Sequence, residues 1–435
     1  MHYILTLILI SSFLFAKSSG FPLVIKEPYG NALFDVTQDY DREISAVGFI
    51  KHYKKSSSNS QKSYSNAFDY LSSIQPSYGS QMHLIKVDGN ANITLRKTVN
   101  LNEFNEAVSI LKTPTNGYFA GGHSQDGSLL LLKLDSEGNI VFKESFGTSQ
   151  YDKMSKLVAL RDGGVLAVCS SATSKSPNEN PFGTGLGSID IYLVRFSSDG
   201  SKVWSNKYGG GYDDIGIDAA ETNDGTIVVL SQIKRTGSSS ASIMRISQNG
   251  DKIWMQSFGG EKMVTPYKIL KLRENKFVIS LTQKNEINKE QIRLIKFDIE
   301  KNIEIDKVID SVYDSVLMDI KEYSDSNIIG VGYTRDKSDT DALAMAFNRD
   351  FRVLHQEHYG NSNYDKFNAV SILHNSQAIA VGVQTDNSSQ EGNMWMVKLG
   401  KNLKAPQSSA LVVKKRVIVK KATTKRKIKK KCKCC

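Results

Sequence analysis

The stretch Leu294-Ile295-Lys296-Phe297-Asp298 is an apolar run of strand length that is interrupted by one basic residue and ends at a turn. The same pattern occurs seven times along the chain. The seven central residues are Lys86, Lys133, Arg195, Arg245, Lys296, Ala346 and Lys398. Their spacings are 47, 62, 50, 51, 50 and 52 residues. A repeat of about fifty residues indicates a fold that is built from one supersecondary unit per repeat.

Each repeat predicts four short antiparallel strands and no helix. The apolar runs alternate or are continuous over strand length, without helical periodicity. Gly- and Asn-containing turns such as Asp88-Gly89-Asn90 separate the third strand from a fourth, as in Lys202–Gly209. Seven units of four strands predict an all-β, seven-bladed β-propeller over residues 21–404.

The two ends of the chain predict how the ring closes. The seventh unit stops after its third strand near Lys404, whereas residues 21–30 match an isolated fourth strand. We therefore expect this N-terminal strand to be the outer strand of the seventh blade. An open solenoid or two unrelated β domains are the alternatives.

The units resemble the repeats of bacterial secreted β-propeller proteins. The closest copy runs from Trp204 through Tyr208-Gly209-Gly210 and Tyr212-Asp213-Asp214 to Asn223-Asp224-Gly225. The resemblance implies a propeller of the cell envelope or exterior. It implies no single activity, because one fold hosts many functions.

The N-terminus predicts export. Tyr3–Ala16 is an apolar run of 14 residues that is followed by small polar residues, which is typical of a signal peptide. We expect a signal peptide at residues 1–18 and an exported protein that is periplasmic, outer-membrane-associated or secreted. A buried first strand or a membrane anchor is the alternative.

Charge divides the chain into a neutral body and a basic tail. Residues 411–435 contain 12 Lys or Arg and no acid, whereas the other 410 residues contain 44 basic and 45 acidic residues. This balance argues against nucleic-acid binding by the body. We expect the tail, residues 405–435, to be disordered and to attract an anionic envelope surface.

The four cysteines are unevenly placed. Cys169 lies in an apolar run and is expected to be buried, so the body has no disulfide framework. Cys432, Cys434 and Cys435 end the tail. These three thiols are candidate ligands of a soft metal, copper(I) or zinc, or alternatively a covalent anchor or part of a sorting signal.

Two insertions between the second and third strands predict a binding face. They occupy Lys51–Ser80 in the first unit and Ser170–Ser188 in the third. Long loops on a rigid scaffold often carry binding residues. The candidates are Tyr64, Phe68, Tyr70 and Tyr78, with an envelope protein or glycan as partner; tolerated surface decoration is the alternative reading.

Aspartates that follow an aromatic residue recur near the start of the units. They are Asp35, Asp152, Asp213, Asp314 and Asp365. Such carboxylates could bind a cation at the axis, or could accept hydrogen bonds from backbone amides between blades, which is the reading we favour.

These features predict a non-catalytic binding or scaffolding propeller. No catalytic motif is recognisable in the body, and no cofactor is expected there. The alternatives are a propeller enzyme, with a quinone cofactor or acting on glycans, and a metal-handling protein that uses the C-terminal cysteines.

Overall fold

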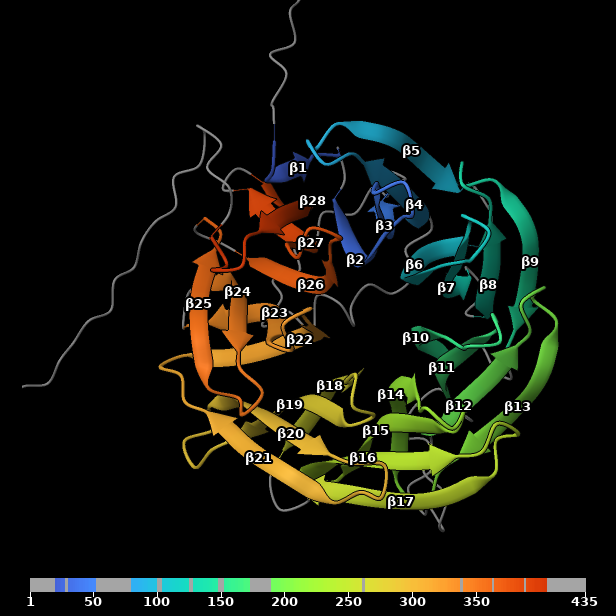
Figure 1. Cartoon of the computed structure of the whole chain (residues 1–435), viewed down its shortest axis with the longest axis vertical. Coiled ribbons are helices and arrows are strands. Elements are labelled where there is room, and N and C mark those ends of the chain that lie inside the picture. Colours follow the sequence, from blue (N-terminus) through green and yellow to red (C-terminus); the bar gives the residue numbers. More distant parts are fainter. Residues whose placement is uncertain are drawn as a thin grey trace, which may run out of the picture.

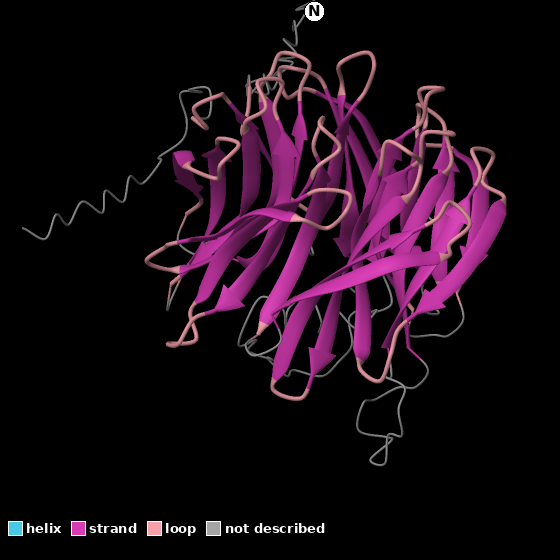
Figure 2. Cartoon of the chain, turned by 60° about the horizontal axis from the view of Figure 1, so that its bottom comes forward, coloured by secondary structure: helices cyan, strands magenta, loops and turns pink. Residues whose placement is uncertain are grey.

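A computed structural model of the chain describes eleven segments: residues 20–27, 30–51, 80–99, 104–124, 128–147, 152–172, 189–259, 263–336, 339–361, 364–386 and 389–404. These segments form 28 strands in seven four-stranded antiparallel sheets. The sheets are the blades of a closed ring (Figure 1), and a tilted view shows strands and turns throughout the described part (Figure 2). None of the described residues forms a helix that is long and apolar enough to cross a bilayer. The seven-bladed prediction is therefore confirmed.

The blades follow one another along the chain. Blade 1 contains β2 (Asn31–Gln38), β3 (Ile44–Lys51), β4 (Ser80–Val87) and β5 (Ile93–Val99). Blade 2 contains β6 (Phe104–Lys112), β7 (Tyr118–Ser124), β8 (Leu129–Leu134) and β9 (Ile140–Phe146). Blade 3 contains β10 (Lys153–Ala159), β11 (Val165–Ala172), β12 (Ile189–Phe196) and β13 (Lys202–Tyr208). Blade 4 contains β14 (Asp213–Glu221), β15 (Ile227–Arg235), β16 (Ser238–Ile246) and β17 (Lys252–Gly259).

The remaining blades complete the ring. Blade 5 contains β18 (Val264–Lys271), β19 (Phe277–Lys284), β20 (Glu290–Phe297) and β21 (Ile303–Ile309). Blade 6 contains β22 (Asp314–Glu322), β23 (Ile328–Arg335), β24 (Thr340–Phe347) and β25 (Val353–Tyr359). Blade 7 contains β26 (Asp365–Ile372), β27 (Ala378–Asp386), β28 (Ser389–Leu399) and β1 (Leu23–Ile25). The first strand of blades 1 to 6, and β26 of blade 7, lies nearest the axis (Figure 1).

The hydrophobic core lies between the blades. Each of the seven neighbouring pairs of blades shares a buried apolar cluster. Strand β8 shows how one apolar run serves two of them, because successive side chains of a strand point to opposite faces. Leu130 and Leu132 pack toward blade 1, whereas Leu129 and Leu131 pack toward blade 3. Continuous apolar strands are thus needed wherever both faces of a sheet are covered.

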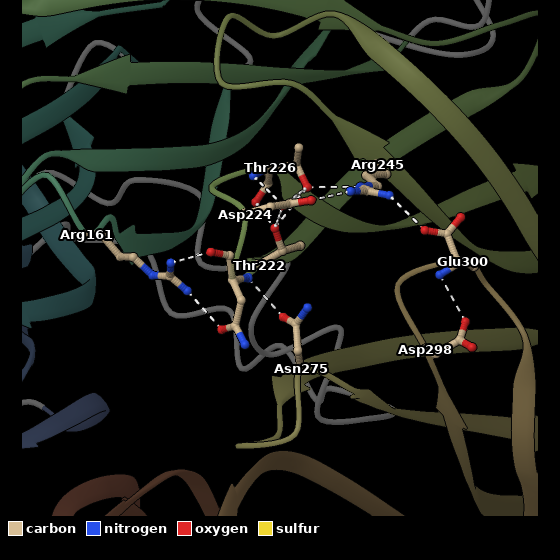
Figure 3. A network of polar contacts seen from close by, with 9 residues as sticks. Arg161, Thr222, Asp224, Thr226, Arg245, Asn275, Asp298 and Glu300 are labelled. Atoms are coloured by element: carbon tan, nitrogen blue, oxygen red, sulfur yellow. Dashed lines mark hydrogen bonds and ion pairs between the residues drawn. The ribbon is translucent and has the colours of Figure 1, made fainter.

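Polar side chains also join neighbouring blades at their hairpins. The Arg161 guanidinium of blade 3 donates to the backbone O of Asn223 at 2.6 Å and to its Oδ1 at 2.9 Å. The Asn223 N–H then donates to Asn275 Oδ1 of blade 5 at 2.9 Å. Arg245 of blade 4 reaches Glu300 of blade 5, with an N–O distance of 3.7 Å. Figure 3 shows these contacts as a network across three blades.

The basic residues that mark the repeat also connect neighbouring blades. Most of them donate to a backbone carbonyl in the hairpin between the third and fourth strands of the next blade. The pairs are Lys86 with Ser136, Lys133 with Ser198, Arg195 with Gln248, Lys296 with Arg349, and Lys398 with Gly89. The N–O distances are 2.7 Å for Arg195, 2.8 Å for Lys133 and 3.4 Å for the others. Ala346 lacks a donor and leaves its junction without this bond.

The hairpin turns between the third and fourth strands of blades 2, 3 and 4 match the expected chemistry, whereas that of blade 1 does not. Gly138, Gly200 and Gly250 occupy the turn position with positive φ in blades 2, 3 and 4. In blade 1 this position is held by Ala91, with φ 64°, and not by Gly89 as Asp88-Gly89-Asn90 suggests. The Ala91 N–H donates to the Asp88 carbonyl, so the residue with positive φ lies two positions after the glycine.

The ring closes through the N-terminal strand, as predicted. Strand β1 pairs antiparallel with β28, and Leu23, Val24 and Ile25 lie opposite Met396, Trp395 and Met394. Ile25 is buried in the cluster between blades 7 and 1. The pairing covers the ladder edge that β28 would otherwise expose.

Deleting residues 21–30 should therefore weaken the whole ring. Blade 7 becomes three-stranded, with a free edge that is able to pair with another chain. We expect a lower midpoint of thermal unfolding and oligomers in size-exclusion chromatography. Deleting residues 405–435 leaves the β1–β28 pair intact and is the control. A monomer without residues 21–30 that melts like the parent would contradict this closure.

Candidate functional site

A ring of side chains lines the axis at one level of the propeller. The innermost strand of every blade has a register shift in its pairing with the next strand. The residues that follow the shift are Asp35, Ser109, Lys156, Asp218, Lys268, Asp319 and Ala369, in blade order. Bulges of this kind redirect a side chain. Here they bring charged residues of several blades together.

These charges pair with one another, in part across the ring. Lys156 Nζ of blade 3 lies 2.7 Å from Asp35 Oδ2 of blade 1. Lys268 Nζ lies 2.9 Å from Asp218 Oδ2 and 3.7 Å from Asp319 Oδ1. Lys321, also on β22, lies 3.7 Å from Asp319 Oδ1. Three lysines thus neutralise three aspartates; we call these six residues the axial network.

The aspartates of the axial network also bind the backbone of the next blade. Asp35 Oδ2 accepts hydrogen bonds from the Ile110 N–H and from Ser109 Oγ, both at 2.9 Å. Asp218 Oδ2 accepts from the Ile269 N–H at 3.2 Å, and Asp319 Oδ2 from the Val370 N–H at 3.0 Å. These carboxylates satisfy amides that the bulges would leave unpaired.

Burial and pairing set the pKa values in the axial network. Burial raises the pKa of Asp35, but the charge and hydrogen bond of Lys156 and the Ile110 amide hold it below its usual value. Burial lowers the pKa of Lys268, and the charges of Asp218 and Asp319 more than reverse that effect. For Lys321 burial prevails over Asp319, and its pKa is lowered. Asp35 and Lys268 are therefore charged at neutral pH.

The expected alignment of the recurrent aspartates is wrong at Asp35. Asp35 lies at the bulge inside β2, and its equivalents are Asp218 and Asp319. Asp314 and Asp365, by contrast, are the first residues of β22 and β26. The dipeptide Phe34-Asp35 has the same residue types as the other aromatic-Asp pairs. It lies several residues later in its unit than they do in theirs.

Three of these aspartates accept hydrogen bonds from backbone amides. Asp35 bonds an amide of the next blade, and Asp314 Oδ1 accepts from the Glu290 N–H of blade 5 at 2.9 Å. Asp365 accepts from the Asn361 and Thr385 N–H groups at 2.7 and 3.0 Å. The interpretation as acceptors of backbone amides between blades is confirmed for Asp35 and Asp314, whereas the Asp365 bonds stay within blade 7 and the approach to it.

A second polar group lies on the face from which the insertions leave. His123 Nε2 accepts the Met154 N–H at 3.0 Å, and His123 Nδ1 lies 3.8 Å from Glu106 Oε1. Burial raises the pKa of Glu106 to about 6, against the opposing charges of Lys153 and Lys51. Burial, and then Lys153, lower the pKa of His123 to about 4. No sequence motif pointed to this pair, because its members are isolated in the chain.

Among the described residues, one group of carboxylates has the spacing of a metal site. Ligand atoms of Asp39, Asp41 and Glu43 lie within 4.8 Å of one another. The Lys86 ammonium already lies 2.9 Å from Glu43 and 3.4 Å from Asp39. This internal cation neutralises part of the group, and the cluster ties the first hairpin of blade 1 to its third strand.

The residues predicted from the sequence fall into two sets. Cys169 is fully buried in the cluster between blades 2 and 3, as expected, and burial raises its pKa. Tyr64, Phe68, Tyr70 and Tyr78, and likewise Cys432, Cys434 and Cys435, lie outside the described residues. The predicted insertions connect β3 with β4 and β11 with β12, so both leave from the same face of the ring.

Comparisons with known proteins extend no further than the fold. No protein-family model and no curated protein matches the chain. An endo-arabinase from Bacteroides thetaiotaomicron is 9% identical over 59% of this chain and 94% of its own, with a TM-score of 0.34. Sqt1 from Chaetomium thermophilum is 10% identical over 88% and 84%, with a TM-score of 0.42. A puromycin-hydrolyzing peptidase from Mycobacterium tuberculosis is 11% identical over 86% of this chain and 55% of its own, with a TM-score of 0.47.

Replacing Lys268 by Met should destabilise the ring strongly. The change leaves Asp218 and Asp319 buried without their shared cation, which costs about 3–5 kcal/mol. Urea denaturation near neutral pH measures the loss in the free energy of unfolding.

The matched control breaks an exposed ion pair. Glu274 and Arg349 form such a pair, with side chains that are 54% and 59% exposed. Glu274→Gln should cost less than about 1 kcal/mol. Equal losses in the two variants would show that the axial network contributes no more than a surface pair.

Proposed function

We propose that this chain is a non-catalytic binding or scaffolding propeller of the bacterial cell envelope, attached to an anionic surface through its basic tail. The observation that carries the proposal is the common origin of the two insertions on one face of a rigid ring. Charged groups at the axis already bind one another and the backbone. The axial network therefore acts as a structural element, and recognition is assigned to the loops around it.

The described residues beside the insertions suit a polar partner. Lys51 is the last residue of β3 and the first of the first insertion, and its charge lowers the pKa of Glu106. Glu106 and His123 add an acceptor and a neutral imidazole to this face at neutral pH. With Tyr64, Phe68, Tyr70 and Tyr78 in the insertion, the face combines hydrogen-bonding groups with aromatic rings, as a glycan or protein partner requires.

Attachment is assigned to the tail because of its charge. Twelve basic residues and no acid lie in residues 411–435, whereas the rest of the chain is close to neutral. Each lysine or arginine near an anionic membrane contributes about 1 kcal/mol of attraction. The propeller itself has no comparable excess of positive charge.

Removing residues 411–435 should release the protein from vesicles that contain an anionic lipid and leave the ring folded. Binding of the parent in a sedimentation assay should weaken between about 0.1 M and 1 M salt, as the screening length falls from ~10 Å to ~3 Å. Replacing Cys432, Cys434 and Cys435 by Ser keeps all twelve charges and should leave this binding unchanged.

A binding that depends on the cysteines and not on salt would assign attachment to the thiols. If the Ser variant fails to bind and the parent does not respond to salt, covalent attachment or metal chelation becomes the leading account of the tail. Zinc and copper content of the parent, of the Ser variant and of the tail deletion then distinguishes these two.

Replacing Tyr64, Phe68, Tyr70 and Tyr78 together by Ser should abolish binding to envelope glycans or to an isolated envelope protein. The midpoint of thermal unfolding should stay within about 2 °C of the parent, because the four residues lie in an insertion between two strands. A variant that binds the same probes as the parent would assign the insertion to surface decoration.

A further inference from the structure

The junction between blades 7 and 1 contains a small cavity. An eighth apolar cluster lies there, made of Ala32, Phe49 and Val383. Phe34 and Tyr364 pack against it. The cavity between these side chains is also lined by Asn31, Lys366 and Asn368. It has room for one particle of about the size of a water molecule.

Lys366 brings an unusual charge to this cavity. Its side chain is 3% exposed, and it makes no hydrogen bond or ion pair with any residue that the structure describes. Its Nζ lies 6.0 Å from the centroid of the Tyr364 ring. Burial lowers the pKa of Lys366 to about 8. The ammonium form still prevails near pH 7 and is costly to bury without a counter-charge.

Two other lysines of low exposure show the contrast. Lys86 lies beside Asp39 and Glu43, and Lys268 beside Asp218 and Asp319. In both cases the carboxylates raise the pKa of the lysine, whereas burial alone acts on Lys366.

Asn31 adds a second donor to the same cavity. Its side-chain Oδ1 accepts the Met394 N–H, which fixes the orientation of the amide. Asn31 Nδ2 is then buried without a partner among the described residues. The remaining amide of the cavity is engaged, since Asn368 Nδ2 donates to the Leu33 carbonyl at 2.7 Å.

We propose that this cavity binds one chloride ion between Lys366 and Asn31. A cation and an N–H donor that both lack a partner call for a negatively charged acceptor. A monatomic halide is only slightly larger than water, whereas a carboxylate or phosphate exceeds the space. A water molecule could accept from Asn31 but would leave the charge of Lys366 uncompensated.

Chloride at this position would stabilise ring closure. Asn31 begins β2 of blade 1, and Lys366 lies on β26 of blade 7, so the ion would bridge the two blades that join the ends of the ring. An ion that binds only the folded ring raises its stability by mass action.

Thermal unfolding of the full chain near pH 7 tests the proposal. Sodium chloride is exchanged for sodium gluconate at constant ionic strength, with chloride up to about 0.5 M. The midpoint should rise by about 2 °C with chloride and saturate. Lys366→Met should lose this chloride-specific rise. Lys398→Met changes a lysine that reaches Gly89 across the same two blades, and it should keep the full rise.

A second measurement does not depend on the variant folding. Crystals of the parent soaked in sodium bromide should show anomalous scattering between Lys366 Nζ and Asn31 Nδ2. An equal midpoint in chloride and gluconate, or no halide at this position, would overturn the proposal and assign the cavity to water or to a neutral amine.

Discussion

No blade of this protein can cover its own apolar faces. Strand β8 sends Leu130 and Leu132 to one neighbour and Leu129 and Leu131 to the other, so blade 2 needs a partner on each side. The same requirement applies to every blade, and only a closed ring meets it for all seven. Burial between the blades requires a closed ring. This ring is then stabilised by the hairpin contacts, the axial network and the β1–β28 pair.

The polar groups of the axial network are engaged by the protein itself, through bonds to neighbouring blades and to one another. Asp35, Asp218 and Asp319 each bond a backbone amide of the following blade while a lysine neutralises the carboxylate. Removing one partner of such a buried pair leaves the other charge without compensation. A scaffold with a fixed axis leaves variation to its loops, which agrees with our assignment of recognition to the insertions.

The sequence predicted the fold well because many positions in each unit follow the same repeat pattern. Strand lengths, the apolar runs and the unpaired strand at residues 21–30 all agree with one ring. The axial network was not predictable, because the residue that follows the bulge differs from blade to blade among Asp, Ser, Lys and Ala. The cavity at Lys366 was equally hidden: Asn31 lies at the opposite end of the chain, and only closure brings the two residues together.

The pairing of β1 with β28 also constrains how the molecule is made. Strand β1 precedes every other strand in the chain, whereas β28 follows all of them. During synthesis, six blades can form while the first strand is still unpaired. Contacts between such distant residues form slowly, and until then both ends of the unfinished ring expose unpaired backbone and apolar surface. The last step of folding is therefore the one at which the chain is most exposed to aggregation.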